Sequence, residues 1–174
     1  MINLMESIKG KVIDVRSGTV DINPEHIIDG YIKFQIEEKL VWCFIGYWRN
    51  YFPYNLPYSR FGVGKELVKN LLGQIFDIQV HFTTVQSAKL NFKEKKIIPE
   101  PNQKKPCDYH IFGEIISKLP HPKWPEQVDK LIIDCGLILE VNADKGQYTE
   151  GEYIFMEGRM DAIILDFEKN AIKP

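Results

Sequence analysis

The sequence predicts a mainly β protein, and three observations support this fold class. Apolar and polar residues alternate along several segments, such as 32–36 and 74–83, with the period of a strand that has one buried face. Turn-forming residues, such as Arg16, Ser17 and Gly18, separate these segments. Helix signals are few, so strands are expected to dominate the 174 residues.

The expected strands follow one another along the whole chain. They cover residues 8–15 with a short return at 20–22, then 31–36, 40–48, 74–83, 109–118, 131–141, 152–156 and 159–167. Residues 37–39 are expected to join the strands 31–36 and 40–48 in a hairpin. The strand 40–48 is apolar on both faces, which is typical of a central strand, and Trp42 and Trp48 are assigned to the core.

One or two short helices are expected. Asn23 and Pro24 have the pattern of an N-cap followed by proline at the first helical position, and Gly30 limits that helix to a turn or two. Residues 65–72 are interpreted either as a short helix that ends at Gly73 or as an irregular strand.

Residues 86–106 interrupt the strand pattern and are interpreted as a linker or a long exposed crossover. The segment contains six lysines, two glutamates and three prolines. It divides the chain into a first half, residues 1–85, and a second half, residues 107–174. Each half is predicted to form a small antiparallel OB-like or otherwise barrel-like structure. A single α+β domain with one curved antiparallel sheet is the alternative.

A faint internal repeat is consistent with duplication of one small barrel. Glycine, charged residues, an apolar patch and a second glycine precede an alternating strand at 64–78 and again at 151–163. Residues 39–43 and 130–135 also resemble each other, out of register by one. Chance similarity is the alternative, because glycine before an amphipathic strand is common in β proteins.

Charge and cysteine content limit the class of protein. The formal net charge of −2 at pH 7 excludes a strongly basic nucleic-acid-binding coat. Residues 86–106 carry a net charge of +4 and residues 107–174 a net charge of −6, so the second half is expected to attract basic surfaces. Three scattered cysteines, no signal-like N-terminal segment and no long apolar run predict a cytoplasmic protein.

No motif of an enzyme or of a cofactor site is found in the sequence. It contains no P-loop, no GxGxxG and no GxSxG. Cys107 and His110 would point to opposite faces of a strand, which prevents them from acting as a nucleophile and its base. The four histidines lack the HxH and HExxH spacings, so neither a metal site nor a cofactor is expected.

The strongest candidate for a binding site is the aromatic segment 42–65, which contains nine aromatic residues and no acidic residue. Proline and glycine indicate that most of residues 49–64 form a loop, and long loops are often functional. Tyrosine and arginine are favoured at protein interfaces, although packing over an open barrel end would use the same aromatic residues. The predicted partner-binding residues are Trp48, Arg49, Tyr51, Phe52, Tyr54, Tyr58 and Arg60.

The sequence therefore favours a non-enzymatic binding protein that recognises a protein partner through the aromatic loop and the acidic second half. An inhibitor or immunity-type protein that neutralises a basic partner is one example of this class. The alternative is a tandem OB-like single-stranded nucleic-acid-binding protein, in which the aromatic rings stack on bases. The acidic second half disfavours that alternative, because affinity for nucleic acid depends on neutralising phosphates.

Overall fold

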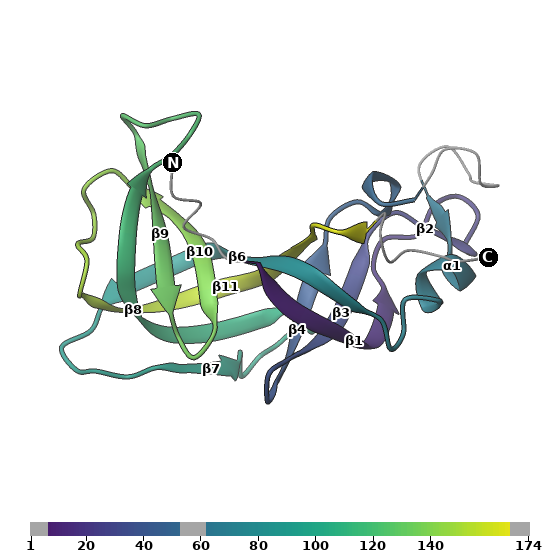
Figure 1. Ribbon diagram of the computed structural model, residues 1–174, viewed down its shortest axis with the longest axis horizontal. Helices are drawn as coiled ribbons and strands as arrows, with labels where there is room; N and C mark the ends of the chain where they lie inside the picture. The colour runs from purple at the N-terminus through teal and green to yellow at the C-terminus, as the bar shows by residue number, and fades with distance from the viewer. Residues whose placement is uncertain (1–6, 53–61, 168–174) are drawn as a thin grey trace. The chain divides into compact units, whose positions relative to one another are not determined.

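A computed structural model of the protein describes residues 7–52 and 62–167 (Figure 1). It is mainly β, with 57% strand and 6% helix, which confirms the predicted class. The strands are β1 (Ile8–Ser17), β2 (His26–Ile27), β3 (Gly30–Ile36), β4 (Lys39–Ile45), β5 (Val63–Gly64), β6 (Ile75–Lys89), β7 (Lys96–Pro99), β8 (Asp108–Pro120), β9 (Val128–Asp134), β10 (Ile138–Asp144) and β11 (Tyr153–Ile164). Helix α1 (Lys65–Lys69) and the 3-10 turn η1 (Trp48–Asn50) are the helical elements of the described residues.

Nine of the strands form one large mixed sheet, and β2 and β5 form a small separate one. The order in the large sheet is β1-β3-β4-β11-β6-β10-β9-β8-β7, with additional pairings of β1 with β6 and of β11 with β8. These additional pairings close two circuits of five strands each. One circuit is β1-β3-β4-β11-β6, and the other is β11-β6-β10-β9-β8.

The chain divides into two compact units that differ from the predicted halves. Unit 1 consists of Met1–Gln79 and Ala162–Pro174, and unit 2 consists of Val80–Asp161. The segment 86–106, interpreted above as a linker or crossover, belongs to unit 2, where it contains the end of β6 and all of β7. None of its residues is buried. The units differ from the predicted halves because the last residues of β11 belong to unit 1. This placement depends on pairing between strands far apart in sequence, which no local pattern encodes.

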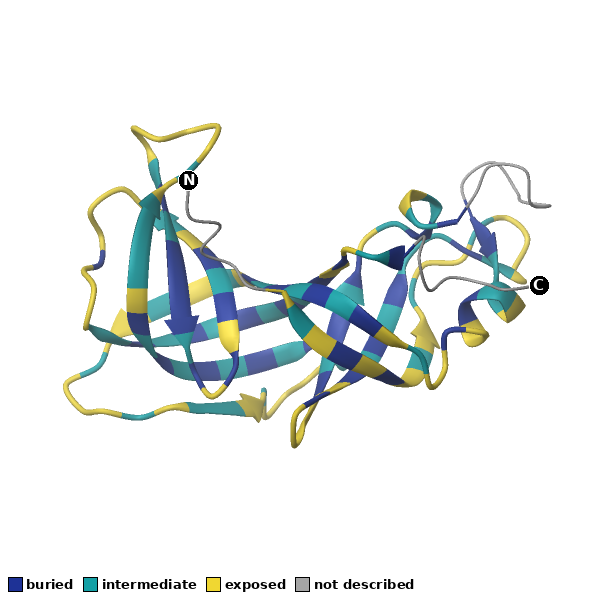
Figure 2. Ribbon diagram, in the orientation of Figure 1, coloured by how far each residue is buried: buried dark blue, intermediate teal, exposed yellow. Residues whose placement is uncertain are grey.

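In unit 1 the register of β3 and β4 decides which side chains enter the core. Ile32 and Phe34 of β3 are buried, and they pair with Cys43 and Val41 of β4, which are also buried. Figure 2 shows the resulting alternation of buried and more exposed positions along these strands. Trp42 therefore lies on the outer face, half-buried, and its assignment to the core was wrong.

Trp48, in contrast, belongs to an aromatic cluster inside unit 1. Its side chain has no exposed surface, and its ring lies 6.2 Å from the ring of Phe52. The centre of the Phe167 ring lies 5.1 Å from that of Phe52 and 5.9 Å from that of Phe76, on which it stacks. The chain reaches this position because β4 ends at Ile45 and η1 folds Trp48 back over the core.

In unit 2 two of the expected strand boundaries were wrong. The expected strand 131–141 is a hairpin of β9 and β10, because Gly136 adopts a positive φ of 93° that reverses the chain. The expected strands 152–156 and 159–167 are one continuous strand, β11, as far as Ile164. Gly158 sits inside it where a Cβ atom would lie 2.1 Å from the carbonyl oxygen of Thr83, so only glycine permits this close approach to β6.

The segments that resemble each other in sequence are not equivalent in structure. Residues 65–69 form α1, whereas residues 153–155 belong to β11. The strand order also differs between the units. Numbered along the chain within each circuit, it is 1-2-3-5-4 in the first and 1-4-3-2-5 in the second.

The two tryptophans six residues apart provide a direct test of the unit 1 core. We expect Trp48→Ala to lower the free energy of unfolding by about 3–5 kcal/mol, because it removes a fully buried aromatic side chain. Trp42→Ala, as the matched control on the outer face, is expected to cost far less. Urea denaturation monitored by far-UV circular dichroism measures both. Equal losses in the two variants would contradict the assignment of faces.

A second prediction concerns the acid stability of unit 2. His81 lies opposite Glu140, and burial lowers the pKa of His81 below the usual histidine value of 6.5, although Glu140 acts in the other direction. The unfolded chain then takes up the proton first, so stability is lost as pH falls through 6.5 towards the folded pKa. We expect His81→Gln to lose less stability than the wild type between about pH 7.5 and about pH 5. Parallel losses in urea denaturation at the two pH values would contradict this.

Candidate functional site

The structure places the predicted partner-binding residues in different environments. Trp48 and Phe52 are buried in the core of unit 1, so their side chains are not part of a surface, contrary to the prediction. Tyr51 is partly buried, and its hydroxyl oxygen accepts a hydrogen bond from the amide of Ile164 at 3.3 Å. Burial raises the pKa of the Tyr51 phenol. Arg49 is half-buried, while Tyr54, Tyr58 and Arg60 lie outside the described residues.

A different aromatic and basic surface lies on the outer face of β1, β3 and β4. The ladders place nine outward positions in three rows across the three strands. We call them the outer-face array, and the rows are Lys11, Gln35 and Leu40; Asp14, Lys33 and Trp42; and Arg16, Tyr31 and Phe44. The array contains three aromatic residues, three basic residues and one acidic residue, all within unit 1.

Contacts between cations and rings organise the array. The Arg16 guanidinium carbon lies 4.5 Å from the centre of the Trp42 ring, and the Lys33 ammonium nitrogen lies 5.9 Å from it. Both distances are within the range of a cation–π attraction. In the next row the rings of Tyr31 and Phe44 lie 5.8 Å apart and are tilted by 51°. The side chains are therefore held in place by their cross-strand neighbours, as in stable pairs on other sheets.

Sequence reasoning missed the array because β4 is apolar on both faces. The signal that could have found it is the clean alternation of β3 combined with the two-residue turn at Glu37 and Glu38. Glu37 has a positive φ of 54°, and the turn pairs Ile36 with Lys39. Three residues before Ile36 is Lys33, and three residues after Lys39 is Trp42, so these two residues are paired. Lys33 is polar and points outward, and Trp42 therefore points outward as well.

The net charge of unit 2 is less negative than that of the second half, residues 107–174, which was predicted to be an acidic binding surface. The unit contains eleven basic and thirteen acidic residues, because it includes the lysine-rich segment 86–106. Lys95 forms ion pairs with Glu114 at 3.1 Å and Asp134 at 2.8 Å, and Lys89 pairs with Glu152 at 3.0 Å. Hydrogen bonds from Lys95 hold the pKa of the Glu114 carboxyl below its usual value. Lysines within the unit thus neutralise carboxylates that were expected to attract a basic partner.

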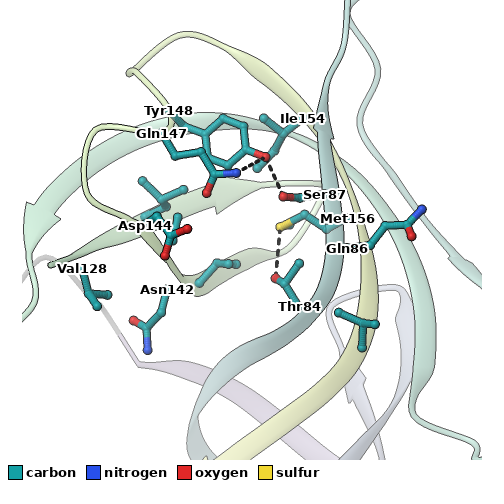
Figure 3. Close-up of a pocket in the computed structure, with 14 residues that line it drawn as sticks. Thr84, Gln86, Ser87, Val128, Asn142, Asp144, Gln147, Tyr148, Ile154 and Met156 are labelled. Carbon is teal, nitrogen blue, oxygen red and sulfur yellow. Dashed lines mark hydrogen bonds between the residues drawn. The ribbon is translucent and has the colours of Figure 1, made fainter.

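Unit 2 also has a cavity of about 630 Å³ between β6 and β10 (Figure 3). These strands pair in parallel only at His81–Phe82 and Glu140–Val141, and the cavity lies beyond that point. The buried residues Leu131 and Met156 line it, and so do Tyr148 and Ser87, whose hydroxyl oxygens lie 2.5 Å apart. The volume is in the range of small-molecule pockets. The lining offers hydroxyl and amide groups and the carboxylate of Asp144, and no histidine or cysteine of the described residues lines it.

The cysteines of the protein are buried thiols. None of Cys43, Cys107 and Cys135 forms a disulfide, and burial raises the pKa of Cys107 to about 12. A thiol with this pKa is protonated near neutral pH and is a poor nucleophile. The imidazole of His110 lies on the half-buried outer face, whereas Cys107 is buried.

Comparison of the chain with protein-family models, with curated proteins and with solved structures found no match. In the described part of the chain, no helix has the length and apolar character needed to cross a membrane.

Proposed function

We propose that the protein is a non-enzymatic binding protein and that its partner is another protein, which contacts the outer-face array. The observation that supports this proposal is the three-row register, which gathers Trp42, Tyr31 and Arg16 on one rigid face. Tryptophan, tyrosine and arginine are the residue types that contribute most to binding at protein interfaces. The array takes over the role that the sequence assigned to the loop after Trp48.

The packing of the array favours tight binding. Arg16 already lies over Trp42 and Tyr31 already contacts Phe44, so little side-chain freedom is lost when a partner covers them. Leu40 is 53% exposed at one end of the array and offers additional apolar surface. Three basic residues against one acidic residue favour a partner surface that carries carboxylates at the rim of an apolar centre.

Photo-crosslinking in the native host tests this proposal with matched positions. A benzoylphenylalanine at position 40 is expected to crosslink one defined partner, because Leu40 belongs to the array. The same group at position 72 is the control, since Leu72 is 50% exposed in unit 1 but lies outside the array. With the purified partner, Trp42→Ala is expected to weaken binding roughly thirtyfold, the effect of a hot-spot residue. Equal crosslinking at both positions, or unchanged affinity in Trp42→Ala, would contradict the proposal.

A second candidate function is binding of single-stranded nucleic acid, and one observation favours it. The circuit β1-β3-β4-β11-β6 has five strands in a closed order, with α1 between the third and the fourth in the chain, an arrangement similar to an OB barrel. OB barrels bind oligonucleotides on the face of their second and third strands, which here are β3 and β4. The modest positive charge of the array weighs against this function.

Salt dependence separates the two functions. We expect weak or no binding of labelled single-stranded DNA or RNA at physiological ionic strength, because few cations of the array can contact phosphates. Fluorescence anisotropy across a salt series measures it, with Arg16→Glu and Trp42→Ala as variants. Sub-micromolar binding that falls steeply with salt and is lost in both variants would replace the protein-partner proposal with the nucleic-acid one.

A further inference from the structure

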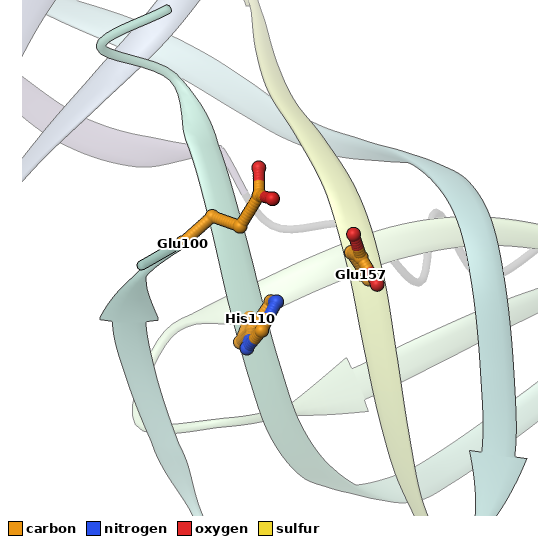
Figure 4. A group of neighbouring side chains, drawn as sticks. All are labelled: Glu100, His110 and Glu157. Carbon is orange, nitrogen blue, oxygen red and sulfur yellow. The ribbon is translucent and has the colours of Figure 1, made fainter. Parts of the chain in front are cut away.

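Three side chains with metal-ligand atoms meet on the outer face of unit 2 (Figure 4). They are Glu100, His110 and Glu157, each half-buried, and their ligand atoms all lie within 4.8 Å of one another. His110 of β8 lies directly opposite Glu157 of β11 in the antiparallel ladder. On the other side of β8, His110 lies opposite Ile98 of β7, and Glu100 follows the end of that strand.

The backbone and the neighbouring side chains fix these three residues. The amide of Glu100 donates a hydrogen bond to the carbonyl oxygen of Asp108 at 3.1 Å, which ties the end of β7 to the start of β8. The centres of the His110 and Phe155 rings lie 5.2 Å apart, and the rings are nearly perpendicular, with an interplanar angle of 81°. Glu157 precedes Gly158, where a Cβ atom would lie 2.1 Å from the carbonyl oxygen of Thr83 in β6. The cluster is therefore built on β8, on β11 and on the residue that directly follows β7.

The carboxylates of the cluster differ from several others in unit 2 in their ion pairing. Glu114, Asp134, Glu140 and Glu152 of unit 2 each form an ion pair with a lysine. In contrast, neither Glu100 nor Glu157 forms an ion pair with lysine, arginine or histidine within the described ranges. Two carboxylates that share a small volume repel each other, and a bound cation would relieve that repulsion.

We propose that Glu100, His110 and Glu157 bind one divalent first-row transition-metal ion such as Zn²⁺. Zinc–ligand distances of about 2.0–2.2 Å let one ion touch atoms that are about 4 Å apart, so small side-chain rotations complete the site. The imidazole favours zinc-like ions over Mg²⁺ and Ca²⁺, which prefer oxygen ligands. Three protein ligands leave further coordination positions to water. The site lies in unit 2 and does not depend on the function proposed for the outer-face array of unit 1.

Isothermal titration of the EDTA-treated full chain with ZnCl₂ tests the proposal. We expect one equivalent to bind, and we expect Glu100→Gln, His110→Ala and Glu157→Gln each to weaken binding roughly tenfold or more. His121→Ala is the matched control, because His121 stacks on Trp124 at 4.9 Å and is not part of the cluster. Circular dichroism in EDTA shows whether each variant keeps the wild-type fold.

A measurement on the unaltered protein covers the case in which a variant does not fold. Sub-stoichiometric Co²⁺ is expected to broaden the NMR signals of the His110 ring before those of the other histidines. Absence of saturable Zn²⁺ binding by the wild type would overturn the proposal. Unchanged affinity in folded cluster variants, or Co²⁺ broadening centred on another histidine, would overturn it as well.

Discussion

The register of the antiparallel ladders is the constraint on which the rest of the structure depends. Side chains alternate between the faces of a strand, so a slip of one residue would exchange the buried set for the outer set. In unit 1 the buried residues Ile32, Phe34 and Ile36 hold β3 in register, because exposing them would remove much of the apolar surface from the core. The outer-face array and the cluster of Glu100, His110 and Glu157 are both products of such registers.

Both proposed sites are supported mainly by strands, and Glu100, which directly follows β7, is the exception. Binding residues are commonly carried on loops, where the chain is free to vary. Residues on strands have less conformational freedom than residues on loops, but their side chains are already ordered before a ligand binds. Arg16 over Trp42 and Phe155 beside His110 are examples, and such prior ordering lowers the entropy lost on binding. This is why we place the proposed protein contact on β1, β3 and β4.

Trp42 and Trp48 show which aspects of burial the local sequence pattern can predict and which it cannot. A tryptophan on an apolar strand has no preference for either face until a second strand is added. The turn at Glu37 and Glu38 supplies that second strand, and the pairing of Trp42 with Lys33 directs Trp42 outward. Trp48 lies beyond the end of β4 and is buried in a ring cluster that also contains Phe52, Phe76 and Phe167, which come from three separate segments. No window of the sequence contains that cluster.

The sequence by itself determined the mainly β class, most strand positions and the hairpin of β3 and β4. These follow from alternation and turn residues, which act between neighbours in the chain. Only the tertiary structure decided that the end of β11 belongs with the first unit, that the lysines of 86–106 neutralise carboxylates of unit 2, and that Glu100, His110 and Glu157 meet. Pairing between strands far apart in sequence sets these features. Such pairing depends on the free energy of the whole core rather than on any local preference.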